Sequence, residues 1–288
     1  MRRNSRIVKT VFFSLATTLV LPTIAFGQSS TPAPKQNTSA GPAKALAALA
    51  AQDPNTKKAK DLLNKMITAM GGQPFLAYQT MTQEGRTYSF YQGQPNSLGT
   101  LFWRFWKYPD KDRIELTKQR DVTYIYTGDK GYEITYKGTA AVEPKDLSEY
   151  LLRRKYSLEQ LVRVWMKDPA TLVLYEGSAL AERQFVEQVS LVNKENESVT
   201  LGIDPNSGLV LKKSFTYRDY DGLKSTDDEV YANYRPEQGI QTAHTIVRYH
   251  NGQQTGQRFL TKVEYNVPIE ESKFEAKVTY DMYQLKKK

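Results

Sequence analysis

Residues 99–108 carry bulky apolar side chains at consecutive positions, and this constrains the fold of the 288-residue chain more than any other feature. Their composition is typical of a β-strand, in which successive side chains point to opposite faces of the sheet. Leu101, Trp103 and Phe105 therefore share one face. The other face carries Phe102, Trp106 and Tyr108. An antiparallel sheet normally exposes one polar face to water. Both faces of this strand must instead be covered, by a core, by a helix or by a bound apolar ligand.

The N-terminal residues have the pattern of a cleaved secretory signal. Four basic residues precede an apolar run at 11–21, and small residues precede Gln28. The run is far shorter than the roughly 20 residues that a transmembrane helix needs. We predict a signal peptide at 1–27 with cleavage near Gly27 and a periplasmic location. A flexible leader rich in Ser, Thr, Pro and Ala should follow at 28–52, and a single folded domain at 53–288.

The composition excludes several classes of function. The sequence has no cysteine, which excludes disulfides, thiol catalysis and cysteine-ligated metals. The net charge is +9, but four of these charges lie in the predicted signal peptide and three lie at 286–288. The remaining +2 lacks the dense basic face of a nucleic-acid-binding protein, so we expect no nucleic-acid partner.

Short alternating segments separated by turn residues dominate from residue 78 onward. Strands and helices do not alternate along the sequence, so a parallel sheet is not expected. The pattern predicts a mainly β domain, built as an antiparallel meander, a sandwich or an open barrel. The predicted strands are 78–91, 99–108, 113–117, 122–127, 131–136, 172–176, 183–192, 198–203, 209–218, 228–234, 242–249 and 258–266.

A helix is predicted before the first strand. Asp53 followed by Pro54 is typical of a helix start, because the carboxylate caps free N–H groups and proline suits the first turn. Apolar residues at helical spacing follow, until Gly71 and Gly72 end the helix.

A second helical segment interrupts the strands between Pro144 and Pro169. Ser157 with Gln160 resembles a capping box, which favours two helices that meet near Tyr156. A helical insertion with an apolar stripe should lie across one face of the sheet. The stripe, which we interpret as a lid, consists of Leu147, Leu151, Leu158, Leu161 and Trp165.

Candidates for catalysis are few. His244 and His250 fall on one predicted strand about 20 Å apart, at roughly 3.3 Å per residue, which is too far to share a metal. Residues 219–222 lack the later glutamate of an EF-hand and indicate a hairpin turn. No nucleophile, zinc or phosphate-loop motif is present. We predict no catalytic residue, no metal site, no cofactor and no enzymatic activity.

A series of short motifs lies between residues 57 and 274. In chain order they are the helix ending at Gly71-Gly72, Gly99-x-Leu101, Pro109-Asp110-x-x-Arg113-Ile114, Gly128-Asp129-Lys130-Gly131-Tyr132, the inserted helices, the strand–turn–strand at 203–210, and Phe274. This order resembles the periplasmic lipoprotein-carrier family, the LolA/LolB-like superfamily of outer-membrane lipoprotein-sorting proteins, as a divergent member.

The resemblance implies an open antiparallel half-barrel whose concave, apolar face is covered by helices and receives acyl chains. One position departs from the family. The carrier has an arginine immediately before the proline of its second motif, which is important for passing cargo onward. Tyr108 occupies that position here, beside Lys107. The resemblance therefore supports binding of lipids, lipoproteins or another hydrophobic ligand more than delivery to a receptor.

We predict that the cavity is lined by one face of three neighbouring strands. The choice of face is a hypothesis, and Phe102 with Trp106 is the alternative inward set. The predicted cavity residues are Leu101, Trp103, Phe105, Ile114, Leu116, Tyr124 and Tyr126.

Three functions compete at this stage. A carrier binds the acyl chains of lipids or lipoproteins in the cavity. A non-enzymatic envelope interaction or sensor module fills the same space with its own side chains and binds a protein partner. An enzyme requires clustered polar groups in a cleft, for which the sequence gives no support. Fold resemblance does not fix function, so the carrier is our first hypothesis, as a monomer.

Overall fold

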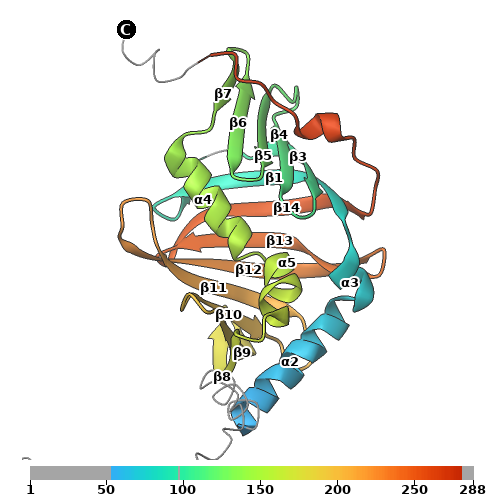
Figure 1. Ribbon diagram of the computed structural model, residues 1–288, viewed down its shortest axis with the longest axis vertical. Coiled ribbons are helices and arrows are strands. Elements are labelled where there is room, and N and C mark those ends of the chain that lie inside the picture. Colours follow the sequence, from blue (N-terminus) through green and yellow to red (C-terminus); the bar gives the residue numbers. More distant parts are fainter. Residues whose placement is uncertain (1–52, 97, 281–288) are drawn as a thin grey trace, which may run out of the picture. The chain divides into compact units, whose positions relative to one another are not determined.

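The computed structural model describes residues 53–96 and 98–280, which form a sheet of 14 strands with helices on one face (Figure 1). The predicted signal peptide and leader lie outside these residues. The strands are β1 (Thr80–Tyr91), β2 (Gln94–Pro95), β3 (Thr100–Lys107), β4 (Lys111–Leu116), β5 (Val122–Thr127), β6 (Lys130–Thr135), β7 (Gly138–Ala141), β8 (Leu172–Ala181), β9 (Gln184–Val192), β10 (Ser198–Ile203), β11 (Val210–Arg218), β12 (Lys224–Glu237), β13 (Ile240–His250) and β14 (Gln253–Tyr265).

The sheet is antiparallel and open. Its strand order is β7-β6-β5-β4-β3-β1-β14-β13-β12-β11-β10-β9-β8, and β2 pairs only with β1. Neighbours in this order are mostly neighbours in the chain, because tight turns join them. An Asn-Gly turn with positive φ at Asn251 (49°) and Gly252 (78°) connects β13 to β14. The predicted mainly β, open antiparallel fold is confirmed.

One pairing joins distant parts of the chain. Strand β1 pairs with β14, with Met81 opposite Tyr265 and Thr87 opposite Arg258. The register shifts at Gly85, where an added Cβ would lie 2.0 Å from the carbonyl oxygen of Phe259. A residue with a side chain would push the two strands apart, so glycine permits their close approach.

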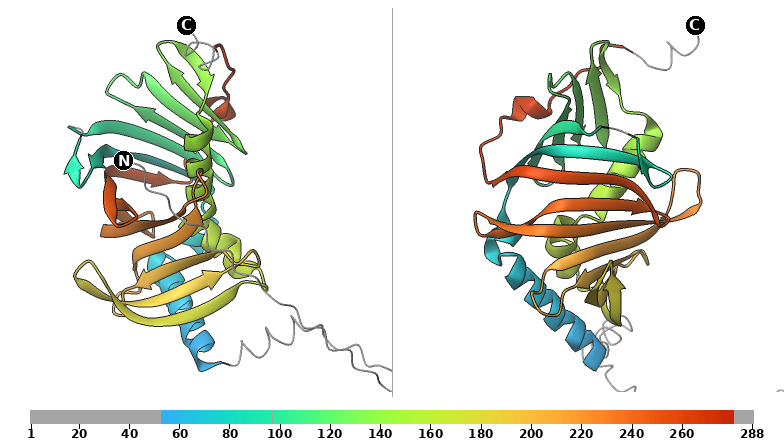
Figure 2. Two further views of the ribbon diagram at one scale, coloured as in Figure 1. Left: turned by 90° about the vertical axis from the view of Figure 1, so that its left-hand side faces the viewer. Right: turned by 180° about the vertical axis from the view of Figure 1, so that it is seen from behind.

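The helices are α2 (Pro54–Met70), α3 (Gln73–Ala77), α4 (Pro144–Lys155) and α5 (Leu158–Arg163), with short 3₁₀ helices η1 (Trp165–Lys167) and η2 (Glu271–Phe274). Helices α4 and α5 cross one face of the sheet, and in the rear view they lie behind it (Figures 1 and 2). We call this the helix-covered face. The main core lies between this face and α2, α3 and α5.

Helix α2 has the predicted bounds. The Asp53 carboxylate accepts a hydrogen bond from the backbone N–H of Thr56 (3.1 Å), which caps the helix. Gly71, with φ of 125°, ends it. The buried side of the helix includes Leu63 and Met66, both fully enclosed in the core.

The inserted segment forms two helices, as the capping pattern predicts. Ser157 is the N-cap of α5, and its hydroxyl oxygen accepts a hydrogen bond from the backbone N–H of Gln160 (3.3 Å). The predicted lid is not uniform. Leu161 and Trp165 are buried core residues, at 0% and 6% exposure. Helix α4 has no buried residue. The part of the insertion beyond Ser157 therefore belongs to the core, and α4 alone is a cover.

The opposite face of β3–β5 is covered by the C-terminal segment. Phe274 of η2 is buried (4% exposed), and its carbonyl oxygen accepts a hydrogen bond from the Thr127 hydroxyl (3.2 Å). Arg113 of β4 donates to the carbonyl oxygen of Lys273 (3.1 Å). Ile125 of β5 lies opposite Arg113 and points to the same face of the sheet, where it is completely buried. The apolar strand therefore has its second face covered by this segment.

Candidate ligand-binding site

A cavity of about 450 Å³ lies between the helix-covered face of the sheet and α4, a size typical of small-molecule sites. Its walls come from β1, β3–β5 and β11–β14 on the sheet side, and from the ends of α2 and α3, from α4 and from the start of α5 on the other. The lining mixes apolar and charged side chains. The charged ones are Arg104, Asp112, Asp146, Glu149, Arg153, Arg154, Glu159, Lys213, Glu229, Arg248 and Arg258.

Part of the predicted site lies in this cavity. Ile114, Tyr124 and Tyr126 line it. The ring of Tyr126 stacks on that of Tyr150 from α4, with centroids 3.5 Å apart and planes 7° from parallel. Burial raises the pKa of the Tyr126 phenol to about 12, so the hydroxyl is neutral at physiological pH. Leu116 lies on the same face and packs against the core, but it does not line the cavity.

The predicted face of β3 is wrong for Leu101, Trp103 and Phe105. Arg104 stands opposite Ile114, so the even-numbered residues of β3 face the cavity, as in the alternative set. Phe105 and Trp103 lie on the opposite face. The ring of Phe105 packs under the ammonium of Lys273 (4.5 Å), and that of Trp103 lies under Arg120 (4.1 Å). Bulky residues occupy both faces of β3, so periodicity did not show which face is inward, and Arg104 points into the cavity.

The cavity is aromatic at the end nearest α3. Tyr78 lies between Trp106 and Tyr265, with ring centroids 5.5 Å and 4.8 Å away. Its hydroxyl donates to Glu159 of α5 (2.7 Å), and burial raises its pKa well above the ordinary value. Phe75 closes this end from α3. These rings provide a large apolar surface, and each buried phenol has a polar partner or stays protonated.

Next to this end, a buried ion pair connects the sheet to α4. Asp112, which is 1% exposed on its side chain, accepts three hydrogen bonds from Nε and Nη2 of Arg104, at 2.8 to 3.1 Å. It also accepts a hydrogen bond from the Tyr150 hydroxyl of α4 (3.0 Å). Burial lowers the pKa of Arg104, but Asp112 more than offsets this and raises it. The charge of Arg104 is therefore neutralised within the protein.

A second charged cluster surrounds Glu229 of β12. Its carboxylate accepts hydrogen bonds from Lys213 (2.9 Å), Arg248 (3.1 Å) and the Tyr231 hydroxyl (2.6 Å). Burial raises the pKa of Glu229, but the two cations outweigh it and hold the pKa far below its ordinary value. Glu229 is therefore ionised and shared between two cations.

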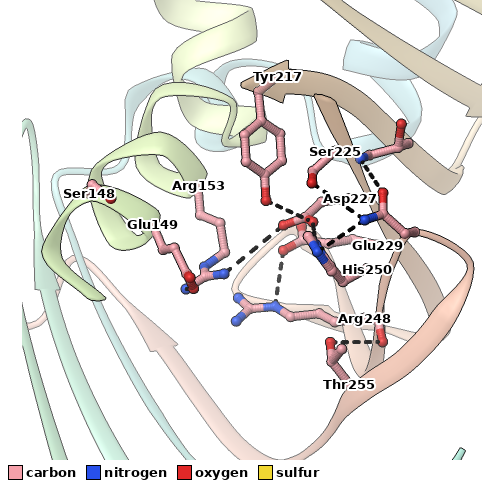
Figure 3. Close-up of polar contacts among 12 residues, drawn as sticks. Ser148, Glu149, Arg153, Tyr217, Ser225, Asp227, Glu229, Arg248, His250 and Thr255 are labelled. Carbon is pink, nitrogen blue, oxygen red and sulfur yellow. Dashed lines mark hydrogen bonds and ion pairs between the residues drawn. The ribbon is translucent and has the colours of Figure 1, made fainter. Parts of the chain in front are cut away.

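Asp227, two residues earlier, holds α4 to the sheet (Figure 3). It accepts hydrogen bonds from Tyr217 (3.1 Å) and His250 (2.8 Å), and Nη1 of Arg153 from α4 lies 4.0 Å away. Arg153 also pairs with Glu149, one turn earlier on α4 (3.4 Å). The side of α4 that faces the sheet therefore makes charged contacts beside its apolar ones, where the sequence pattern predicted an apolar stripe.

Gln83 and Arg258, both in the sheet wall, carry polar groups without a protein partner within the described part of the chain. The side-chain oxygen Oε1 of Gln83, a buried residue, accepts no hydrogen bond. Arg258 makes no hydrogen bond or ion pair there, and its guanidinium lies 5.1 Å from the ring of Phe102. Burial, together with Arg248 and Arg104, lowers the pKa of Arg258 to about 9. Each group is available to a ligand.

The predicted lid residues occupy different environments. Leu147 of α4 packs over Gly131 of β6, where an added Cβ would lie 3.0 Å from its Cδ1 atom. Leu151 is half-buried, and Leu158 lines the cavity. Leu161 lies in the core, as described above, together with Trp165.

No group of three or more His, Asp or Glu side chains within residues 53–96 and 98–280 is arranged to hold a metal ion. Each histidine has its own partners: His244 bonds Glu237 and the carbonyl oxygen of Leu260 (both 2.9 Å), and His250 bonds Asp227. Among the helices of this described region, none is long and apolar enough to cross a membrane.

Sequence reasoning missed the charged part of the site. Asp227, Glu229 and Tyr231 alternate along β12, and such alternation is usually the solvent face of a strand. The one indication of a charged site in the sequence was Arg104, which lies among aromatic residues of β3. A cation in such a strand needs an anionic partner when it is buried.

The sequence matches no protein-family model, and no curated protein is significantly similar to it. Solved structures resemble the fold. A protein of the DUF1329 family from Desulfovibrio piger superposes with a TM-score of 0.54 at 12% identity, covering 77% of this chain and 98% of its own. A putative outer membrane lipoprotein-sorting protein domain from Vibrio parahaemolyticus gives 0.51 at 12% identity, covering 77% and 97%. At this identity the similarity establishes the fold, as the sequence resemblance implied.

Proposed function

We propose that the protein is a binding or carrier protein of the cell envelope, located in the periplasm, that holds the apolar chain of a lipid, a lipoprotein or another hydrophobic ligand. The observation that carries this proposal is the cavity between the open sheet and α4. It combines an enclosed aromatic end with a cover that has no buried residue of its own.

The binding step follows from this geometry. An apolar chain that enters the aromatic end gains about 25 cal/mol for each Å² removed from water. Helix α4 has no buried residue, and it is attached by the polar contacts of Tyr150 and Arg153, by the stack of Tyr150 on Tyr126, and by Leu147 packed over Gly131. Its movement therefore exposes these few apolar contacts and not a continuous apolar face. A bound ligand shifts the population of the cover only through the contacts that it makes in one state.

The proposal gives the cavity no catalytic role. The two acids of its sheet wall are already occupied: Asp112 by Arg104, and Glu229 by Lys213 and Arg248. A general acid or base needs a proton that it can exchange with a substrate, and these carboxylates are paired instead.

The test is a matched pair of substitutions on β13. Ile246 lines the cavity, and Val247, its neighbour, points to the opposite face and is equally half-buried. We expect Ile246→Trp to fill the cavity and weaken binding of a fluorescent fatty acid at least tenfold, while Val247→Trp leaves binding within twofold of the wild type.

Mass spectrometry of lipids extracted from the purified protein provides an independent readout. The wild type and Val247→Trp should both carry acyl chains, and Ile246→Trp should carry much less. Unchanged binding in a folded Ile246→Trp variant, or a wild type without bound lipid and without affinity for the fatty acid, would refute the proposal.

A further inference from the structure

The cavity changes character along the strands that form its wall. Tyr265, at the end of β14, belongs to the aromatic end beside Tyr78. Arg258 lies seven residues earlier on the same strand. It is opposite Ile246 of β13, two residues before Arg248. Because this part of β14 contains the register shift opposite Gly85, it matches six residues of β1, which span about 20 Å. This exceeds the roughly 15 Å of one leaflet of a bilayer's hydrocarbon core. The wall is therefore apolar at one end and cationic further along.

The charges of the sheet wall do not balance. It holds four cations and two anions, because Arg104 is neutralised by Asp112, while Lys213 and Arg248 share Glu229. On α4, the two arginines that line the cavity are also engaged. Arg153 pairs with Glu149 and Asp227, and Arg154 donates to the carbonyl oxygen of Asp110 (3.2 Å). Among the residues that the structure describes, Arg258 is the cation of the sheet wall without an anionic partner.

A guanidinium has five N–H donors and binds carboxylates and phosphates with two parallel hydrogen bonds. One face of the Arg258 guanidinium lies over the Phe102 ring, 5.1 Å from its centre. Its N–H groups remain available to a ligand in the cavity.

Building on the proposed function, we propose that Arg258 binds the anionic head group, a carboxylate or a phosphate, of a single-chain amphiphile whose chain occupies the aromatic end of the cavity near Tyr78 and Tyr265. This orientation places the charged group on the unpaired cation and the chain against the rings.

The experiment compares ligands that differ only in the head group. Delipidated full-length protein is titrated at pH 7.5 with oleate, oleyl alcohol and oleoyl lysophosphatidate. We expect the wild type to bind one or both anions ten- to a hundredfold more tightly than the alcohol, as a hydrogen bond to a charged group implies (about 1.5–3 kcal/mol). The tighter of the two anions identifies the head group.

Variants assign the preference to Arg258. Arg258→Gln should bind anions and alcohol equally, with the affinity for the alcohol unchanged, and Arg258→Lys should keep a preference for the anions. Arg235→Gln, an exposed position on β12, is the control and should behave as the wild type.

Three results would overturn the inference. The wild type shows no preference for the anions, the preference survives Arg258→Gln, or Arg258→Gln loses the alcohol as well, which indicates a structural role. In the first two cases, binding of the alcohol leaves the proposed function standing. If the wild type binds none of the three ligands, the proposed function fails too.

Discussion

Replacing one leucine in each half of the inserted segment tests whether α4 is a separate cover. Leu161 of α5 is completely buried, whereas Leu151 of α4 is half-buried on a helix without any buried residue. A buried Leu→Ala change costs about 2–5 kcal/mol, from lost transfer energy and the cavity that remains. Leu161→Ala should lower the free energy of unfolding by about 3 kcal/mol. Leu151→Ala should cost about 1 kcal/mol or less, because burying a whole leucine is worth only about 1.5–3 kcal/mol.

Urea denaturation followed by tryptophan fluorescence measures both values, provided that the slope against urea stays constant. Hydrogen exchange supplies the local readout: amides of α4 should exchange faster than those of α5 and of the central strands, and lipid should slow them. Equal losses for Leu151→Ala and Leu161→Ala, together with protection of α4 equal to that of α5 and insensitive to lipid, would show that α4 is part of the core. That result would remove the cover from the proposed mechanism.

Three further predictions concern charges and the outer face. Asp112→Ala leaves Arg104 without its buried partner and should cost about 3–5 kcal/mol of stability by urea denaturation, whereas a loss below 1 kcal/mol would contradict the role given to this pair. The pKa of Glu229 is depressed below its ordinary 4.5, so the stability that its ionised form contributes is present above about pH 4.5 and is lost as pH falls further. Below pH 4.5, the stability of Glu229→Gln should therefore fall less steeply than that of the wild type. Parallel curves of stability against pH would contradict this role of Glu229. Phe274→Ala should cost about 3–5 kcal/mol in thermal or urea unfolding without changing ligand affinity, and weakened binding would contradict its place on the outer face.

Local sequence signals predicted the elements well. Strands β5 and β10 have the predicted bounds, and the caps at Asp53 and Ser157 lie at the predicted helix starts. Strand β7, residues Gly138–Ala141, was missed because Gly-Thr-Ala-Ala has no bulky alternation and its pairing with β6 defines it. Turn chemistry and periodicity act over a few residues, so they predict elements that a few residues determine.

The site depended on signals that act between strands. The face of β3 is set by its register against β4, where Arg104 pairs across to Ile114, and periodicity alone could not choose between two bulky faces. The partners of Asp112 and Glu229 come from neighbouring strands and from α4. Spatial pairing of charges is not visible in a single sequence, so the polar wall of the cavity could not be predicted.

The pairing of β1 with β14 has a consequence for how the chain reaches its native state. Strand β1 is the first strand made and β14 the last. Strands β1–β7 and strands β8–β13 can therefore each pair early, but the two parts of the sheet join only when residues 253–265 are available. Contacts this distant in sequence slow folding, and until they form both partner edges remain open to other strands. Because Arg258 and Tyr265 lie on β14, no ligand pocket exists before that step. A chain shortened before β14 would therefore be two partial sheets with exposed edges, and not a smaller working protein.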